Sequence, residues 1–373
     1  MHKVGSAGRP HWRSKVGSAG ACLVAAGALA ACGTAKPAGP PKAQLQSSVS
    51  SLDSSPTVSV DLHLAATAAQ LHAVAPTIPT PFDSLITGAS VVIQETTTNG
   101  KPLASVAKAV QASGSPTAAL DSLRQVDEDL AVNGGGYKLL EIRFVKGVVY
   151  ARADVKDFLG LFGISPTSLA SVKSKIPSGS QYDFERAALA GKWVSFDALS
   201  ALQGFLSTAP VGSPAQTKAL LAKVYGAIST VYTKDITVAA AGSGPKGTTK
   251  LAVSANEHKL VADVVGAFAQ VFPSGVAGLP APNLSKVPNH TITADALLKG
   301  TALSGFQLNI SQFLHSAAAA SNPLVVSATI SHPSVSISAP SGATSASLPA
   351  LAKLFQGASA SKGAPKGSSP ATA

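Results

Sequence analysis

The stretch YKLLEIRFV-KG-VVYARAD occupies residues 137–154. Two runs rich in β-branched and aromatic residues flank a two-residue link that contains glycine, and this pattern is typical of a β-hairpin. Side chains alternate between the two faces of a strand, so the apolar residues of the first run are expected on the buried face: Leu140, Ile142 and Phe144. The charged residues between them are expected on the solvent face: Glu141 and Arg143. The hairpin therefore predicts an antiparallel sheet.

Further strands are predicted on both sides of the hairpin. Residues 57–65 (TVSVDLHLA) alternate apolar and polar side chains, and residues 191–196 (GKWVSF) form another β-rich run. Other strands are expected over 91–96, 234–240, 249–255, 291–298, 305–313, 324–331 and 334–339. Helices are expected over 44–55, 155–162, 198–206, 215–230 and 259–272, and residues 116–130 are expected to begin as a helix. This order of elements predicts an α+β fold.

Residues 1–31 have the composition of a secretory leader. They contain four basic residues and no acidic residue, and they end in an apolar run over 21–31 (ACLVAAGALAA). That run is too short to cross a bilayer, which takes about 20 residues. We therefore predict a cleaved signal peptide over 1–31; an uncleaved anchor or a cleavage point elsewhere is the alternative.

The leader ends in Leu29-Ala30-Ala31-Cys32, which resembles the lipobox of bacterial lipoproteins. The resemblance implies cleavage before Cys32 and a diacylglyceryl group on its sulfur. Acyl chains such as palmitate would then hold the exported protein on the outer face of the cell membrane. Stable anchoring needs two lipid chains, and a diacylated cysteine carries two. The mature chain has no other thiol, because Cys22 leaves with the leader.

The two ends of the mature chain lack large apolar side chains. Residues 32–41 are rich in Pro and Gly and are predicted to form a flexible tether, and residues 357–373 are predicted to be disordered. The folded body is therefore expected over 42–356, a length that suits one large domain or two modest ones.

The charge of the mature chain is moderately basic and thinly spread. It has 25 Lys and Arg against 18 Asp and Glu, a net charge of +7, without a basic cluster that includes aromatic residues. We therefore expect no nucleic-acid partner, whereas weak attraction to an anionic membrane surface is compatible with this charge.

The sequence contains no recognisable catalytic or metal-binding motif. Residues 105–108 fit the S-x-x-K pattern, but its companion motifs are absent, so chance is the simpler interpretation. The acidic run at 127–129 lacks the spacing of a calcium loop, so a solvated turn is the simpler interpretation. The histidines of the body show no metal-ligand spacing (His63, His72, His258, His290, His315 and His332). The sequence thus predicts no enzyme, no cofactor and no metal site.

Three short segments carry a resemblance to a known family. They are Val148-Val149-Tyr150-Ala151-Arg152-Ala153-Asp154, Gly191-Lys192-Trp193-Val194, and the closing pair of predicted strands at 325–330 and 335–340. Together with the lipobox, the tether and the order of elements, they resemble the LppX/LprG-type lipoproteins of actinobacteria, relatives of the LolA/LolB carriers. Because the body is longer than that family's usual domain, three segments are interpreted as insertions: 66–90, 101–135 and 163–190.

The resemblance implies a strongly curved antiparallel sheet, a half-barrel, with helices packed in its concave face around an apolar cavity. An empty cavity of roughly 1,000 Å³ or more would accept acyl chains. The chain would then bind or shuttle lipid, with candidate ligand contacts at Leu62, Ile142, Phe144, Tyr150 and Trp193. The same residues can form a filled core, and the chain would then be a cell-envelope interaction or sensory module. A hydrolase with an unrecognised site is the third alternative.

Overall fold

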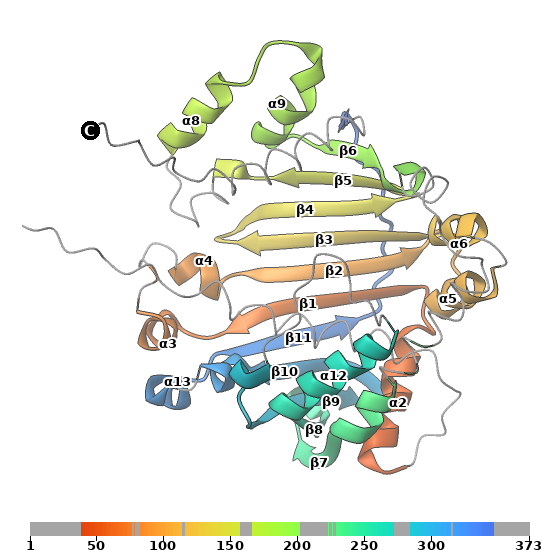
Figure 1. The fold of residues 1–373 in the computed structure, drawn as a ribbon, viewed down its shortest axis with the longest axis vertical. Coiled ribbons are helices and arrows are strands. Elements are labelled where there is room, and N and C mark those ends of the chain that lie inside the picture. Colours follow the sequence, from red (N-terminus) through yellow and green to blue (C-terminus); the bar gives the residue numbers. More distant parts are fainter. Residues whose placement is uncertain are drawn as a thin grey trace, which may run out of the picture. The chain divides into compact units, whose positions relative to one another are not determined.

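The computed structural model describes residues 39–76, 78, 83–113, 116–156, 166–201, 223, 226, 229–271, 284–314 and 316–346 (Figure 1). The predicted leader, Cys32, most of the tether and the predicted tail lie outside these residues. The chain forms two compact units. The first combines the described residues up to Ser54 with those between Ala215 and Gln307. The second combines those between Ser55 and Pro214 with those from Leu308 onward.

The second unit is built on a sheet. Its strands are β1 (Thr57–Ala65), β2 (Ser90–Thr97), β3 (Val126–Gly134), β4 (Tyr137–Val145), β5 (Val148–Ala153), β6 (Val194–Asp197), β11 (Val325–Ser331) and β12 (Thr344–Ser345). They lie in the order β12-β6-β5-β4-β3-β2-β1-β11. The pairs from β11 to β6 are antiparallel, and the short β12 pairs with β6 in parallel.

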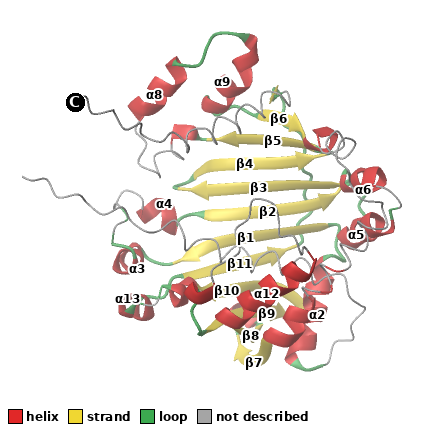
Figure 2. Cartoon of the chain, viewed as in Figure 1, coloured by secondary structure: helices red, strands yellow, loops and turns green. Residues whose placement is uncertain are grey.

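Short helices stand around this sheet, as Figure 2 shows. The strand ends on one side carry α3 (Ala68–Val74), α4 (Asp83–Thr87) and α13 (Ala317–Ser321). The opposite ends carry α5 (Leu103–Ala112) and α6 (Pro116–Leu123). Beyond the β5–β6 edge lie α8 (Pro166–Ser174) and α9 (Asp183–Leu189), and the 3-10 turns of the unit are η4 (Ser180–Tyr182) and η7 (Ile310–Phe313). These helices thus lie at the ends of the strands and beyond one edge of the sheet.

The first unit contains strands with helices packed on them. Its strands are β7 (Thr237–Ser243), β8 (Thr249–Asn256), β9 (Thr291–Lys299) and β10 (Ala302–Asn309), in the order β10-β9-β8-β7. The helix α2 (Pro41–Leu52) packs against β7, and α12 (Glu257–Val271) packs against β8. The unit also has 3-10 turns η5 (Pro245–Gly247) and η6 (Leu284–Lys286).

Lys42 ties the start of α2 to a helix that ends at Asp235. Its ammonium nitrogen donates hydrogen bonds to the carbonyl oxygens of Tyr232 (3.1 Å), Thr233 (2.8 Å) and Ile236 (2.6 Å). The last carbonyls of a helix have no partner within the helix, so a lysine placed there satisfies them and complements the helix dipole.

The predicted α+β fold, an open curved antiparallel sheet with helices packed on it, is confirmed. The strand β1 has the predicted bounds, and the predicted hairpin forms β4 and β5. Its turn needs two residues with positive φ, and Lys146 (51°) and Gly147 (93°) supply them.

Two segments differ from the prediction. Residues 101–135, interpreted as an insertion, contain β3, which lies inside the sheet between β2 and β4. This strand was not predicted because residues 127–129 near its start are acidic, and acidic residues are depleted in strands. Asp127 is buried there and accepts a hydrogen bond from the backbone nitrogen of Lys146 (3.0 Å). Residues 334–339, predicted as a strand, form no strand and pair with no described strand.

Candidate functional site

One face of the sheet in the second unit carries two adjacent apolar rows, and the next row on that face includes Glu95 and Glu128 between Val58 and Phe144. Because directly paired residues point to the same face, the strand register defines two rows of side chains. The first row is Ala328, Leu62, Val91, Val132, Leu140 and Ala153. The second row is Ile330, Val60, Ile93, Leu130, Ile142, Ala151 and Val194. These two rows are the apolar face.

The apolar face is half-buried rather than closed. Leu62, Val91, Val132, Leu140 and Ile142 all keep part of their surface in contact with solvent. Leucine and isoleucine side chains in a packed core are normally buried almost completely. A contiguous apolar surface that stays partly exposed is typical of a ligand groove or an interaction site.

The opposite face carries mostly polar side chains, and several of them are buried. This polar face carries the rows Ser331, Ser59, Gln94, Asp129, Arg143, Tyr150 and Ser195, and Thr329, Asp61, Val92, Ala131, Glu141 and Arg152. Seven of its polar or charged residues are less than a tenth exposed: Thr57, Ser59, Thr96, Asp127, Glu141, Ser195 and Ser327. Polar side chains are thus buried over the middle of this face, whereas Asp61, Thr329 and Ser331 toward β11 remain exposed.

Residues 332–343, which we name the crossing segment, pass over the polar face from β11 to the β6 edge. The carbonyl oxygen of Pro333 accepts a hydrogen bond from the Thr57 hydroxyl (2.7 Å), and that of Ser338 accepts one from Arg143 Nη1 (3.0 Å). In Figure 1 this blue segment runs behind the sheet. The segment gives buried polar side chains hydrogen-bond partners, which they need once water is excluded.

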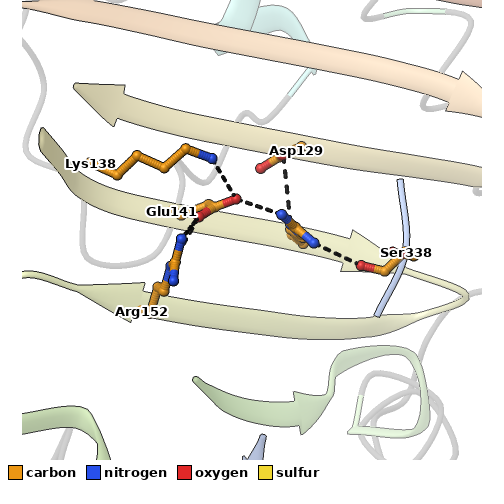
Figure 3. Close-up of polar contacts among 6 residues, drawn as sticks. Asp129, Lys138, Glu141, Arg152 and Ser338 are labelled. Atoms are coloured by element: carbon orange, nitrogen blue, oxygen red, sulfur yellow. Dashed lines mark hydrogen bonds and ion pairs between the residues drawn. The ribbon is translucent and has the colours of Figure 1, made fainter. Parts of the chain in front are cut away.

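Glu141 is the centre of the polar face, and its side chain is fully buried. Its Oε1 accepts hydrogen bonds from Arg143 Nη2 (2.7 Å) and Lys138 Nζ (3.1 Å), and its Oε2 accepts two from Arg152, from Nη2 (2.6 Å) and Nε (3.0 Å) (Figure 3). Asp129 lies beside Arg143, with Oδ2 3.6 Å from Nε. One buried carboxylate is therefore surrounded by three cations.

These contacts decide the charge state of Glu141. Burial alone would raise the pKa of its carboxyl group, but the hydrogen bonds from Arg143, Lys138 and Arg152 outweigh it and lower the pKa from 4.5 to about 2. Burial raises the pKa of Asp129, and the Arg143 guanidinium partly opposes that rise. Glu141 is thus ionised throughout the physiological pH range.

Trp193 covers the two arginines of this cluster. The centre of its ring system lies 5.1 Å from Arg143 Cζ and 4.8 Å from Arg152 Cζ, which is cation–π distance. The Trp193 carbonyl oxygen also accepts a hydrogen bond from the Thr344 backbone nitrogen (3.0 Å) at the end of the crossing segment. The ring contacts limit the positions of the two guanidinium groups, and the backbone hydrogen bond holds Trp193 in place.

A pocket of about 350 Å³ opens beyond the end of β5. Its lining residues come from β4, β5 and the α8 and α9 helices: Lys138, Arg152, Ala153, Asp154, Val155, Lys156, Leu169, Lys173, Leu189, Ala190 and Gly191. We name it the basic pocket. It is smaller than the roughly 1,000 Å³ expected of a cavity for whole acyl chains, and its lining mixes charged and apolar side chains.

The five candidate ligand contacts do not share one face. Leu62 and Ile142 belong to the apolar face, and Phe144 points the same way, two residues from Ile142 on β4. Tyr150 pairs with Arg143 and therefore points to the polar face, where Trp193 stacks on the arginines. The register brings the first three together and separates them from the last two.

The predicted solvent face of the hairpin is wrong. Glu141 is fully buried, and Arg143 is only 22% exposed. The prediction assumed that charged side chains on an alternating strand face water. The crossing segment covers that face instead and supplies the carbonyl partner Ser338, which lies 195 residues beyond Arg143 in the chain. The one local signal was the clustering of Lys138, Glu141, Arg143 and Arg152 on two paired strands, which is compatible with a charge network.

Within the described part of the chain, no three His, Cys, Asp or Glu side chains gather closely enough to hold a metal ion. None of the described helices is both long enough and apolar enough to cross a membrane. The predicted lipobox residues Leu29, Ala30, Ala31 and Cys32 lie outside the described residues.

Comparisons with known proteins identify no family for this chain. No protein-family model matches it, and no curated protein matches it. Among solved structures, the chain matches the crystal structure of the lipoprotein LppX from Mycobacterium tuberculosis at 9% sequence identity. The match covers 80% of this chain and 97% of that chain, with a TM-score of 0.32. A likeness at this level carries no argument, so the interpretation of the site rests on its own geometry.

Proposed function

We propose that this chain is a membrane-anchored, non-enzymatic lipoprotein that binds the acyl chains of a lipid on the apolar face. The observation that carries the proposal is the partial exposure of the two apolar rows in the second unit. Apart from Ala328 and Val194, every residue of these rows stays partly exposed, while the opposite face buries Glu141 and six other polar or charged side chains. Exposed apolar area of this kind is normally occupied by a ligand or a partner in the functional state.

The chemistry of the apolar face favours an acyl chain over a sugar or a peptide. Its two rows contain only Ala, Val, Leu and Ile, so they offer no side-chain hydrogen-bond donor or acceptor. A sugar or a peptide needs several polar partners to replace its hydration. A hydrocarbon chain needs none, and each buried methylene contributes about 0.8 kcal/mol.

The anchor in this proposal is a diacylglyceryl group on Cys32, and the location is the outer face of the cell membrane. Both rest on the sequence Leu29-Ala30-Ala31-Cys32 after a basic leader. A binding surface for acyl chains is useful to a protein held close to the membrane from which such chains come. The rival function is a cell-envelope interaction module, in which a protein partner covers the same apolar face.

Val91 and Val92 test the role of the apolar face with adjacent residues. Both are half-buried valines on β2, but Val91 belongs to the apolar face and Val92 to the polar face. Val91→Thr places a hydroxyl group in the acyl-chain contact and is expected to weaken binding of a fluorescent fatty acid about 10-fold. Val92→Thr is the matched control and is expected to change that affinity less than about 2-fold. Fluorescence titration measures both affinities. Equal effects of the two substitutions would contradict the claim that acyl chains bind on the apolar face.

A further inference from the structure

The basic pocket carries a surplus of positive charge. Four of its lining residues are basic (Lys138, Arg152, Lys156 and Lys173), and one is acidic (Asp154). Glu141 lies beside it and partly neutralises Lys138 and Arg152. Counting Glu141 with the lining residues, four basic and two acidic side chains leave a net charge of +2. The pocket volume of about 350 Å³ falls within the range of small-ligand sites.

The guanidinium group of Arg152 is held in place by neighbouring residues of the basic pocket. Glu141 holds its Nε and Nη2 in a bidentate pair, and the Trp193 ring lies against its guanidinium group. A guanidinium has five N–H donors, and this pair uses two of them. The remaining donors belong to a group whose position is already fixed, so a ligand would lose little side-chain entropy by binding to it.

Lys156 and Lys173 add further positive charge to the basic pocket, whose lining also includes Asp154. Neither forms an ion pair with another described residue, and both side chains are exposed. Two ammonium groups at one pocket repel each other, and an anion placed between them removes that repulsion. Leu169, Leu189 and Ala190 complete the lining, so the same pocket also offers apolar contacts.

Ala153 connects the basic pocket to the apolar face. It lines the pocket, and through the strand register it is also the end of the row that continues with Leu140, Val132, Val91 and Leu62. Four strand-to-strand steps of about 4.8 Å make this row about 19 Å long. One leaflet of a membrane, which is about one acyl chain thick, measures about 15 Å. The row is therefore long enough for a chain that starts at the pocket.

We propose that the basic pocket binds the anionic headgroup of an amphipathic lipid whose acyl chain lies along this row of the apolar face. The inference rests on the proposed function, to which it adds the class of headgroup. Arg152 belongs to the polar face and Ala153 to the apolar face, so the lipid would bend around the edge of β5, which pairs with β6 only over Val148–Ala151. Arg152 positions the anionic group, while Lys156 and Lys173 neutralise it. A zwitterionic or neutral headgroup would gain none of this neutralisation.

The test compares two lysolipids that share one acyl chain and differ in their headgroup. Isothermal titration of the full chain with lysophosphatidylglycerol (anionic) and lysophosphatidylcholine (zwitterionic), below their micelle concentrations, measures both affinities. The double substitution Lys156→Ala/Lys173→Ala is expected to weaken binding of the anionic lysolipid about 30-fold and of the zwitterionic one less than about 3-fold. The matched control, Lys101→Ala/Lys108→Ala, removes two exposed lysines that do not line the pocket and is expected to leave both affinities unchanged.

The results distinguish the headgroup proposal from the acyl-chain proposal. Equal losses for the two lysolipids, or an equal loss in the control variant, would overturn the headgroup assignment while the acyl-chain proposal stands. Inorganic phosphate binding as tightly as the anionic lysolipid would also overturn it, because the pocket would then be a free-phosphate site. Failure of the unsubstituted chain to bind either lysolipid would contradict the proposed function itself.

Discussion

Glu141→Gln is expected to lower the free energy of unfolding by about 3 kcal/mol, the largest stability effect predicted for this chain. The carboxylate is fully buried and accepts four hydrogen bonds from three cationic side chains. A neutral amide keeps the shape but cannot balance these charges, and its nitrogen would face a guanidinium donor. Removing one partner of a buried charge network costs far more than removing an exposed ion pair.

The same network makes stability depend on pH. The pKa of Glu141 is lowered from 4.5 to about 2 in the folded chain. Its stabilisation is therefore fully present above about pH 4.5 and is lost as the pH falls toward 2, by roughly 3 kcal/mol in total. The Glu141→Gln variant has no such group, so its stability should change less than that of the unsubstituted chain over this interval.

Urea unfolding followed by circular dichroism at pH 7 and pH 3 measures both effects. Asp61→Asn is the matched control, because Asp61 is an exposed carboxylate on strand β1 and lies on the same face as Glu141. Its loss is expected to change the free energy of unfolding by less than about 0.5 kcal/mol. If Glu141→Gln were as mild as Asp61→Asn, the buried network would not stabilise the second unit.

Cys32→Ser is expected to move the protein from the membrane fraction to the soluble fraction. A serine cannot take the thioether-linked diacylglyceryl group, so both acyl chains of the anchor are lost. A single fatty chain holds a protein only marginally, and two chains hold it stably. Cell fractionation and immunoblotting should therefore show the membrane-bound share falling more than about 10-fold, while the folded units keep their circular dichroism spectrum.

Cys22→Ser supplies the control for the anchor, since Cys22 is the other cysteine of the chain. It lies within the predicted leader and is expected to leave membrane association unchanged. A Cys32→Ser protein that remains in the membrane fraction after a high-salt wash would refute the lipid anchor. Release of the Cys22→Ser protein from the membrane would instead indicate that the lipid is attached at Cys22.

Local alternation in the sequence was enough to predict most strands. Residues 57–65 became β1 with the predicted bounds, and the hairpin at 137–154 became β4 and β5. In these stretches, local β-propensity and turn chemistry agree with the final fold. The strand β3 was missed because its first residues are acidic, and only its long-range partners reveal why Asp127 is accommodated there.

The faces of the sheet could not be predicted from alternation alone. Alternation shows which residues share a face, but it does not show which face is covered. Here the decisive element is the crossing segment, which buries Glu141 from a distant part of the sequence. Leu140, Ile142 and Phe144 were correctly placed on one face of their strand, whereas the basic pocket depends on α8 and α9, which residue spacing does not bring together with β5.

The central claim is that the apolar face binds acyl chains, and one measurement tests it most directly. The full chain, purified without detergent, is examined by native mass spectrometry and then extracted for lipid analysis. The account predicts a lipid that co-purifies at close to one molecule per chain and is displaced by added fluorescent fatty acid. Protein that carries no lipid and takes up none would contradict the account, and the apolar face would then be an interface for a protein partner.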